Sequence, residues 1–169
     1  INQFVIKPEE VKYAISKDAV KQRINDDVNS YRIALRAIAS STNKRSLIVT
    51  LLPPQTSSVH SLFSEKYADE VPLKNKIFMV GILNSYVIDF LLRQLISINV
   101  SLIFVQQMPI PKMDEVKDAS QIVQISKALL QENKGYYEDL NHLVEGDAYQ
   151  EYSHDELIAE LNARVMLDF

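Results

Sequence analysis

The chain has 169 residues, 47% of them hydrophobic and 24% charged, which is ordinary for one soluble globular domain with a buried core. It contains no cysteine, which excludes disulfides and thiolate metal sites and suits the reducing cytoplasm. Its net charge is −4, so any contact with nucleic acid must come from a local patch rather than from the whole surface.

The cations are concentrated in one stretch of the chain. Residues 28–64 contain no Asp or Glu, but they contain Arg32, Arg36, Lys44 and Arg45, so this segment carries a charge of +4. A positive patch on an acidic body can still meet phosphate, which makes the segment a candidate surface for nucleic acid. Chance clustering of four cations is the alternative.

The first predicted element is a helix that begins at Pro8. Proline suits the first turn, and Glu9 and Glu10 favour the positive end of the helix dipole. Apolar residues then recur every four positions from Val11 to Ala19. The start of the chain lacks the basic residues and the long apolar run of a signal peptide. Because residue 1 is not methionine, we expect a piece of a longer protein.

A β-hairpin is predicted next. Residues 31–39 alternate as in a strand, which places Arg32 and Arg36 together on the face opposite the aliphatic side chains. Residues 40–43 are turn formers, and residues 46–52 are rich in β-branched and apolar side chains before two prolines end the strand. The tip of the hairpin would carry Asn43, Lys44 and Arg45.

Two apolar segments follow. Residues 77–94 predict one buried core helix, with Asp89 and Arg93 spaced to pair on its polar side. These polar residues argue against a membrane span, which needs about 20 mostly apolar residues. Residues 102–105 predict a short strand, which the proline-rich residues 108–111 end.

Helices dominate the last third of the chain. Residues 114–134 are amphipathic, with Gly135 as the expected C-cap. Ser153 and Glu156 have the spacing of a capping box and predict a last helix that ends near residue 167. We therefore expect an α+β fold. A small mixed or antiparallel sheet with a buried helix would form residues 1–111, followed by a C-terminal helical segment, residues 112–169.

The sequence shows no catalytic or metal-binding pattern. Its three glycines are too scattered for a phosphate-binding loop, and His60, His142 and His154 fit no metal-ligand spacing. The acidic residues between positions 138 and 151 do not match a calcium loop, so a solvated acidic face is the default interpretation. We expect no enzymatic activity, no cofactor and no small-molecule substrate in this chain.

Three stretches share the pattern of one known family. Residues 31–54 form an arginine strand, a Thr-Asn-Lys-Arg-Ser turn, a hydrophobic strand and a proline stop; the family usually has threonine where Ser46 stands. Residues 82–111 contain an Asn-Ser helix with Leu-Arg-Gln and a segment closing on Met-Pro-Ile-Pro, and residues 157–165 form a last helix. In this order they resemble the C-terminal part of the target-recognition domain of bacterial restriction-modification adenine methyltransferases, the fused type II enzymes. A related arrangement occurs in type I specificity subunits.

This resemblance implies a DNA-recognition module without chemistry of its own. In such enzymes a methyltransferase domain with an Asn-Pro-Pro-Tyr motif uses S-adenosylmethionine to methylate a flipped adenine, and some members add a nuclease domain. No Asn-Pro-Pro-Tyr occurs in this chain. We therefore expect S-adenosylmethionine in a separate methyltransferase domain of a cytoplasmic parent protein, with double-stranded DNA and that domain as the partners of this chain.

DNA recognition needs phosphate contacts that set the register and contacts to base edges that read the sequence. We expect such contacts from the hairpin and from the polar loop after it: Arg32, Arg36, Asn43, Lys44, Arg45, Gln55, Thr56, Ser57, Ser58 and His60. Lys44 is the candidate for phosphate, and residues 55–60 for contact near bases.

Two alternatives stay open. Arg45 and Thr42 belong to the turn shared by the family, so they can brace the fold instead, as can Arg93 by pairing with Asp89. The helices from Asp114 onward can dock a methyltransferase domain or a second subunit without touching DNA.

Overall fold

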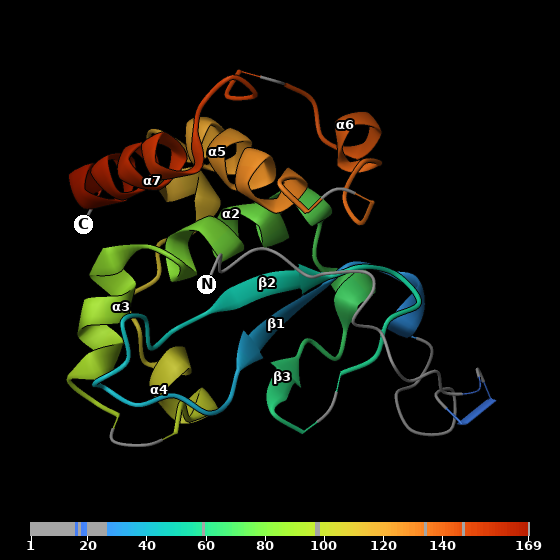
Figure 1. Cartoon of the computed structure of the whole chain (residues 1–169), viewed down its shortest axis with the longest axis horizontal. Helices are drawn as coiled ribbons and strands as arrows, with labels where there is room; N and C mark the ends of the chain where they lie inside the picture. Colours follow the sequence, from blue (N-terminus) through green and yellow to red (C-terminus); the bar gives the residue numbers. More distant parts are fainter. Residues whose placement is uncertain are drawn as a thin grey trace.

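The computed structural model confirms an α+β fold with a small antiparallel sheet (Figure 1). It describes residues 27–58, 60–96, 99–133, 135–146 and 148–168, together with Ser16, Asp18 and Ala19. The helix predicted to begin at Pro8 lies outside the described residues. The described strands and α-helices are β1 Arg32–Arg36, β2 Val49–Leu52, β3 Leu62–Ser64, α2 Leu73–Leu83, α3 Tyr86–Arg93, α4 Leu102–Gln106, α5 Ala119–Gln131, α6 Leu140–Leu143 and α7 His154–Asp168.

The predicted antiparallel pairing of two strands is confirmed, but both strands are shorter than expected, so the connection between them covers residues 37–48 rather than a short turn at residues 40–43. The sheet has the order β2-β1-β3, and both neighbours of β1 run antiparallel to it. Ile33 pairs with Leu51 and Leu35 with Val49, so these four aliphatic side chains share one face. That face is buried, because Leu35, Val49 and Leu51 all belong to the hydrophobic core.

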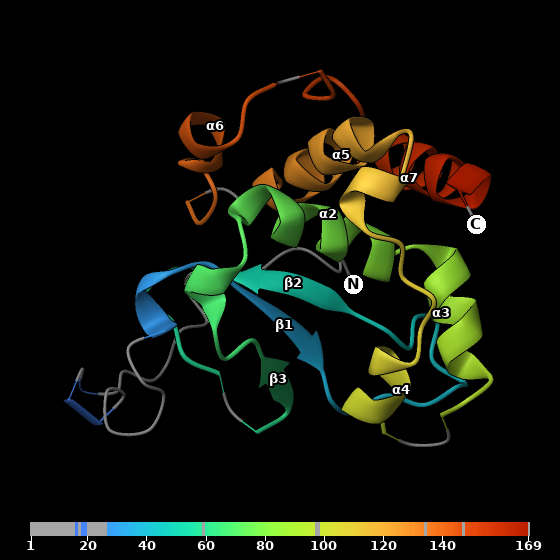
Figure 2. The same ribbon diagram turned by 180° about the vertical axis from the view of Figure 1, so that it is seen from behind.

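Helix α2 covers the buried face of the sheet, and α5 and α7 lie on the far side of α2 (Figures 1 and 2). Ile77, Val80 and Ile82 of α2 are fully buried between these layers. Gly81 allows α5 to approach closely, since a Cβ at this position would lie 2.1 Å from Ser126 Oγ. The sheet, α2 and the C-terminal helices therefore share one continuous core.

The prediction of one helix over residues 77–94 is wrong. The segment forms two helices, α2 and α3, bent by 61° at Asn84 and Ser85. Ser85 caps α3 by accepting the N–H of Ile88 at 3.3 Å. The Asn84 amide accepts the N–H of Val49 at 3.1 Å and donates to the Val49 carbonyl at 2.7 Å, which ties the bend to β2.

The predicted strand at residues 102–105 is also wrong, because these residues belong to helix α4. The Ser101 side chain accepts the N–H of Ile103 at 3.3 Å and caps the helix. A β-bridge occurs just before it, where Asn99 pairs with Ile38. The short apolar run fitted either structure, and the preceding serine was the signal for a helix.

Both predicted C-terminal helices are confirmed; α5 is shorter than expected, whereas α7 has nearly the expected bounds. A 3₁₀ turn at Met113–Glu115 precedes α5, and Glu132 is the C-cap of α5. The prediction of Gly135 as the C-cap is therefore wrong; Gly135 lies beyond the helix, at a φ of +92°. The capping box is present, with the N–H of Ser153 donating to Glu156 at 2.8 Å. Within the described residues no single helix is long and apolar enough to cross a membrane; only the bent pair of α2 and α3 together reaches that length and composition.

Candidate nucleic-acid interface

The turn between β1 and β2 is held in place by Asp89 of helix α3. This carboxylate is 3% exposed. Its Oδ1 accepts the backbone N–H groups of Ser46 at 2.9 Å and of Leu47 at 2.7 Å, and its Oδ2 accepts the Arg93 Nε–H at 2.9 Å. The predicted pair between Asp89 and Arg93 is therefore present. Because backbone groups of the turn bind a buried charge directly, the turn is fixed relative to α3.

Arg93 holds the other side of the same turn. Its guanidinium donates to the carbonyls of Ser41 at 3.2 Å, of Asn43 at 2.5 Å and of Lys44 at 2.6 Å. The side chain is 26% exposed, so part of it remains in contact with solvent. Arg93 thus orients the tip of the turn, where Thr42 and Lys44 are exposed.

Arg45 points into the protein rather than toward solvent. Its guanidinium donates to the Asn84 carbonyl at 2.5 Å, lies 3.8 Å from Asp89 and sits 4.5 Å from the centre of the Tyr86 ring. Burial lowers the pKa of Arg45, and the charge of Asp89 acts in the opposite direction. Arg45 braces the junction between the turn and the start of α3.

The expectation that the hairpin presents its cations outward fails for Arg32 and Arg45. Arg32 is fully buried and donates to the Thr56 carbonyl, and Arg45 is 6% exposed. Arg36 is half-buried and donates to the Arg45 carbonyl at 2.9 Å. Alternation along β1 correctly predicted that Arg32 and Arg36 lie on the same face of the strand, but the loop after β2 covers Arg32. Of the four predicted cations, only Lys44 is exposed.

The polar loop after β2 extends along the whole length of β1. The N–H of Gln55 donates to the Val28 carbonyl before β1, whereas the N–H of Ala37, just after β1, donates to the Ser61 carbonyl at 2.9 Å. His60 therefore lies toward the turn, and Gln55 lies toward the opposite end. Within the loop Gln55, Ser57 and His60 are exposed, while Thr56 and Ser58 are partly buried.

The end of β1 brings together three segments that are distant in sequence. Ala37 contacts Ser61 on one side and accepts the N–H of Val100 at 2.9 Å on the other, and Ile38 forms the bridge to Asn99. We call the exposed part of residues 38–45, 60–61 and 99–107 the β1-end surface; none of these residues is Asp or Glu. Figures 1 and 2 show the turn, α3 and α4 at this same end of the molecule.

Sequence reasoning missed the contribution of residues 99–107. A signal was present, because residues 71–113 contain only one acidic residue, Asp89, and the structure buries it. Residues 28–64, which contain no acidic residue, therefore lie beside a second segment, residues 71–113, whose one acidic side chain is buried. Gln106 and Gln107 add exposed amides to the β1-end surface.

The described residues contain no group of three or more His, Asp or Glu side chains that could hold a metal ion. His154 instead pairs with Glu132 at 2.8 Å beside the capping box. Comparison with protein-family models, with curated proteins and with solved structures finds no match for this chain.

Proposed function

We propose that this chain is a non-catalytic DNA-recognition module of a restriction-modification adenine methyltransferase and that it contacts DNA through the β1-end surface. The proposal depends on one observation: this surface joins three segments that contain no carboxylate side chain, although the chain has a net charge of −4. A polyanion is repelled least at such a surface. The motif resemblance of residues 31–54 and 82–111 supplies the class of enzyme.

The proposed division of labour follows from exposure. Lys44, and the exposed part of Arg93, bind phosphate. The half-buried Asn43 and the exposed Gln106 and Gln107 carry the amides that pair with base edges, preferably adenine. Arg32 and Arg45 act indirectly, because their buried guanidinium groups brace the backbone that carries these side chains.

The bracing of the turn supports this function. A recognition loop that is already ordered loses little conformational entropy when it binds. Here Asp89 and Arg93 together take up five backbone groups of residues 41–47. The position of Lys44 is therefore set before any ligand arrives.

A docking module is the second candidate function. Exposed hydrophobic side chains at the same end of the molecule favour it, since Phe90 is 62%, Ile103 61% and Ile38 56% exposed. Exposed apolar residues are typical of protein–protein interfaces, whereas protein–DNA interfaces are more polar. Such a surface would receive the methyltransferase domain of the parent protein, where S-adenosylmethionine is expected to bind.

Charge reversal of one exposed lysine separates the two candidates. We compare Lys44→Glu with Lys117→Glu, which makes the same change at an exposed position before α5. Binding of the chain to a fluorescent duplex of random sequence is measured by anisotropy over a series of salt concentrations. Loss of one phosphate contact lowers the slope of log affinity against log salt by about 0.9.

If the proposal is right, Lys44→Glu weakens binding about tenfold at low salt and reduces this slope, while Lys117→Glu changes the affinity less than about twofold. Equal effects of the two variants, or no binding even at low salt, would contradict DNA contact at the turn. Arg36 is unsuitable for this test because its guanidinium holds the Arg45 carbonyl, so its replacement would disturb the turn itself.

A further inference from the structure

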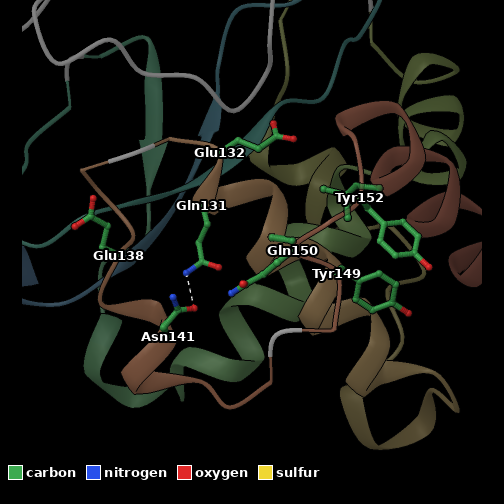
Figure 3. Close-up of a pocket in the computed structure, with 9 residues that line it drawn as sticks. Gln131, Glu132, Glu138, Asn141, Tyr149, Gln150 and Tyr152 are labelled. Atoms are coloured by element: carbon green, nitrogen blue, oxygen red, sulfur yellow. Dashed lines mark hydrogen bonds between the residues drawn. The ribbon is translucent and has the colours of Figure 1, made fainter.

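An open cavity of about 370 Å³ lies between α5, α6 and residues 149–152 (Figure 3). Figure 1 places α6 at the end of the molecule away from α3 and α4, so this cavity is separate from the β1-end surface. Its volume is at the lower end of the range of about 300–1,000 Å³ that small-ligand sites occupy. The cavity therefore suits a small group rather than a nucleic acid strand.

One amide in the cavity is oriented by its neighbours. The Gln131 Nε2 donates to Asn141 Oδ1 at 2.8 Å and to the Tyr137 carbonyl at 3.3 Å. A side-chain amide nitrogen has two N–H groups, so both are taken and the Gln131 Oε1 is left as an acceptor. Figure 3 shows this oxygen turned away from Asn141 and toward Gln150. The inner part of the cavity thus offers a fixed site for a hydrogen-bond donor.

Aromatic and apolar side chains form the other part of the cavity. The rings of Tyr149 and Tyr152 meet edge to face, with centroids 5.2 Å apart and planes at 64°. Ala128 and Leu157 add apolar surface beside them. In Figure 3 the tyrosines lie on one side and Glu138 on the opposite side, with the amides between them. A ligand with an aliphatic part and a charged end matches this division.

The charge around the cavity is negative. Its lining contains Glu132 and Glu138 but no Lys or Arg. The Glu132 carboxylate is paired with His154, whereas Glu138 is exposed and forms no ion pair with any residue that the structure describes. Residues 136–156 include no Lys or Arg, and their acidic members are Glu138, Asp139, Glu145, Asp147, Glu151, Asp155 and Glu156.

We propose that this cavity binds a primary ammonium group on a short alkyl chain. The ammonium donates to the Glu138 carboxylate, a second N–H group farther along the ligand donates to the Gln131 Oε1, and the methylene groups lie against Tyr149 and Leu157. Phosphate-bearing ligands are disfavoured because the negative potential repels them. The same chemistry occurs in free polyamines and in the lysine side chain of a protein, and the experiment distinguishes these two sources.

The test uses the ¹⁵N-labelled chain and NMR chemical-shift titrations. The probes are spermidine and Nα-acetyl-lysine methylamide, and the matched control ligand is the norleucine analogue, which has the same aliphatic chain without the ammonium. The key variant is Glu138→Gln, which keeps the size of the exposed side chain and removes its charge. Glu145→Gln is the control variant, because it makes the same change in the acidic segment outside the cavity lining.

Both ammonium probes are expected to shift amide signals of residues 128–132 and 149–152, and the norleucine analogue is not. Glu138→Gln should weaken binding about fivefold, the effect expected for the loss of one solvent-exposed ion pair, and Glu145→Gln less than about twofold. Tighter binding of spermidine identifies polyamines as the source, and equal or tighter binding of the lysine analogue identifies protein lysines. Equal binding of the norleucine analogue, or an unchanged affinity in Glu138→Gln, overturns the proposal.

Discussion

Replacing Asp89 with alanine should loosen the turn between β1 and β2 and destabilise the whole chain. The carboxylate is buried and accepts N–H groups from Ser46, Leu47 and Arg93, while the buried Arg45 lies 3.8 Å away. Alanine at this position leaves two backbone N–H groups without an acceptor. It also leaves one buried guanidinium without its counter-charge.

The size of the effect follows from these contacts. A hydrogen bond to a charged group contributes about 1.5–3 kcal/mol, and removal of one partner of a buried ion pair costs about 3–5 kcal/mol. These terms are not additive, because all of them belong to one carboxylate. We expect Asp89→Ala to lower the free energy of unfolding by about 4 kcal/mol, a large part of the about 5–15 kcal/mol typical of native proteins. Asp89→Asn keeps an acceptor for the backbone and should lose about 2 kcal/mol.

Urea unfolding followed by far-ultraviolet circular dichroism measures these differences, provided that the slope against urea stays unchanged. Glu160→Ala is the control, because Glu160 forms a solvent-accessible i,i+4 pair with Arg164 at 2.6 Å. Such pairs contribute about 0–1 kcal/mol. If Asp89→Ala destabilises the chain no more than Glu160→Ala does, the carboxylate does not hold the turn and the reasoning is refuted.

Two further predictions concern the core. Gly81→Ala should destabilise the chain by about 1–3 kcal/mol in urea unfolding, because the new Cβ meets Ser126 Oγ and this clash outweighs the better helix propensity of alanine; adding Ser126→Ala should restore stability, and a failure to do so would locate the clash elsewhere. Burial and the hydrogen bond to Asp139 raise the pKa of Tyr31, so stability should fall as the pH rises above about 10, where only the unfolded chain ionises. Tyr31→Phe should make this fall smaller, and an identical alkaline profile would contradict the shift; Tyr137, whose pKa burial also raises, accounts for a remaining fall.

Local patterns in the sequence predicted the pairing of β1 and β2 and the last helix, whereas the third strand, β3 at Leu62–Ser64, was not predicted. The alternation in residues 31–39 indicated β1, and Ser153 with Glu156 indicated the start of α7. The break between α2 and α3 depends on a distant contact, since the Asn84 amide binds Val49. The sequence on both sides of the break is apolar, so local periodicity did not indicate where one helix ends and the next begins.

The candidate site was less predictable than the fold. The positions of the arginines were visible, but their direction depended on acceptors far along the chain. Arg45 is drawn inward by the Asn84 carbonyl, and Arg32 by the Thr56 carbonyl. Alternation assigns a face of a strand but does not show whether a later loop covers that face. The contribution of residues 99–107 required the bridge between Ile38 and Asn99, which no local pattern indicates.

The contacts of Asn84 and Tyr137 have a consequence for self-association. β2 is an outer strand of the sheet, and an outer strand usually leaves a row of backbone groups open to strand addition and aggregation. Here the Asn84 amide occupies the outward N–H and C=O of Val49, and the Tyr137 hydroxyl occupies the carbonyl of Leu51. These two side chains make the hydrogen bonds that a further strand would make at these positions. Another chain therefore cannot extend the sheet at β2 without first displacing them.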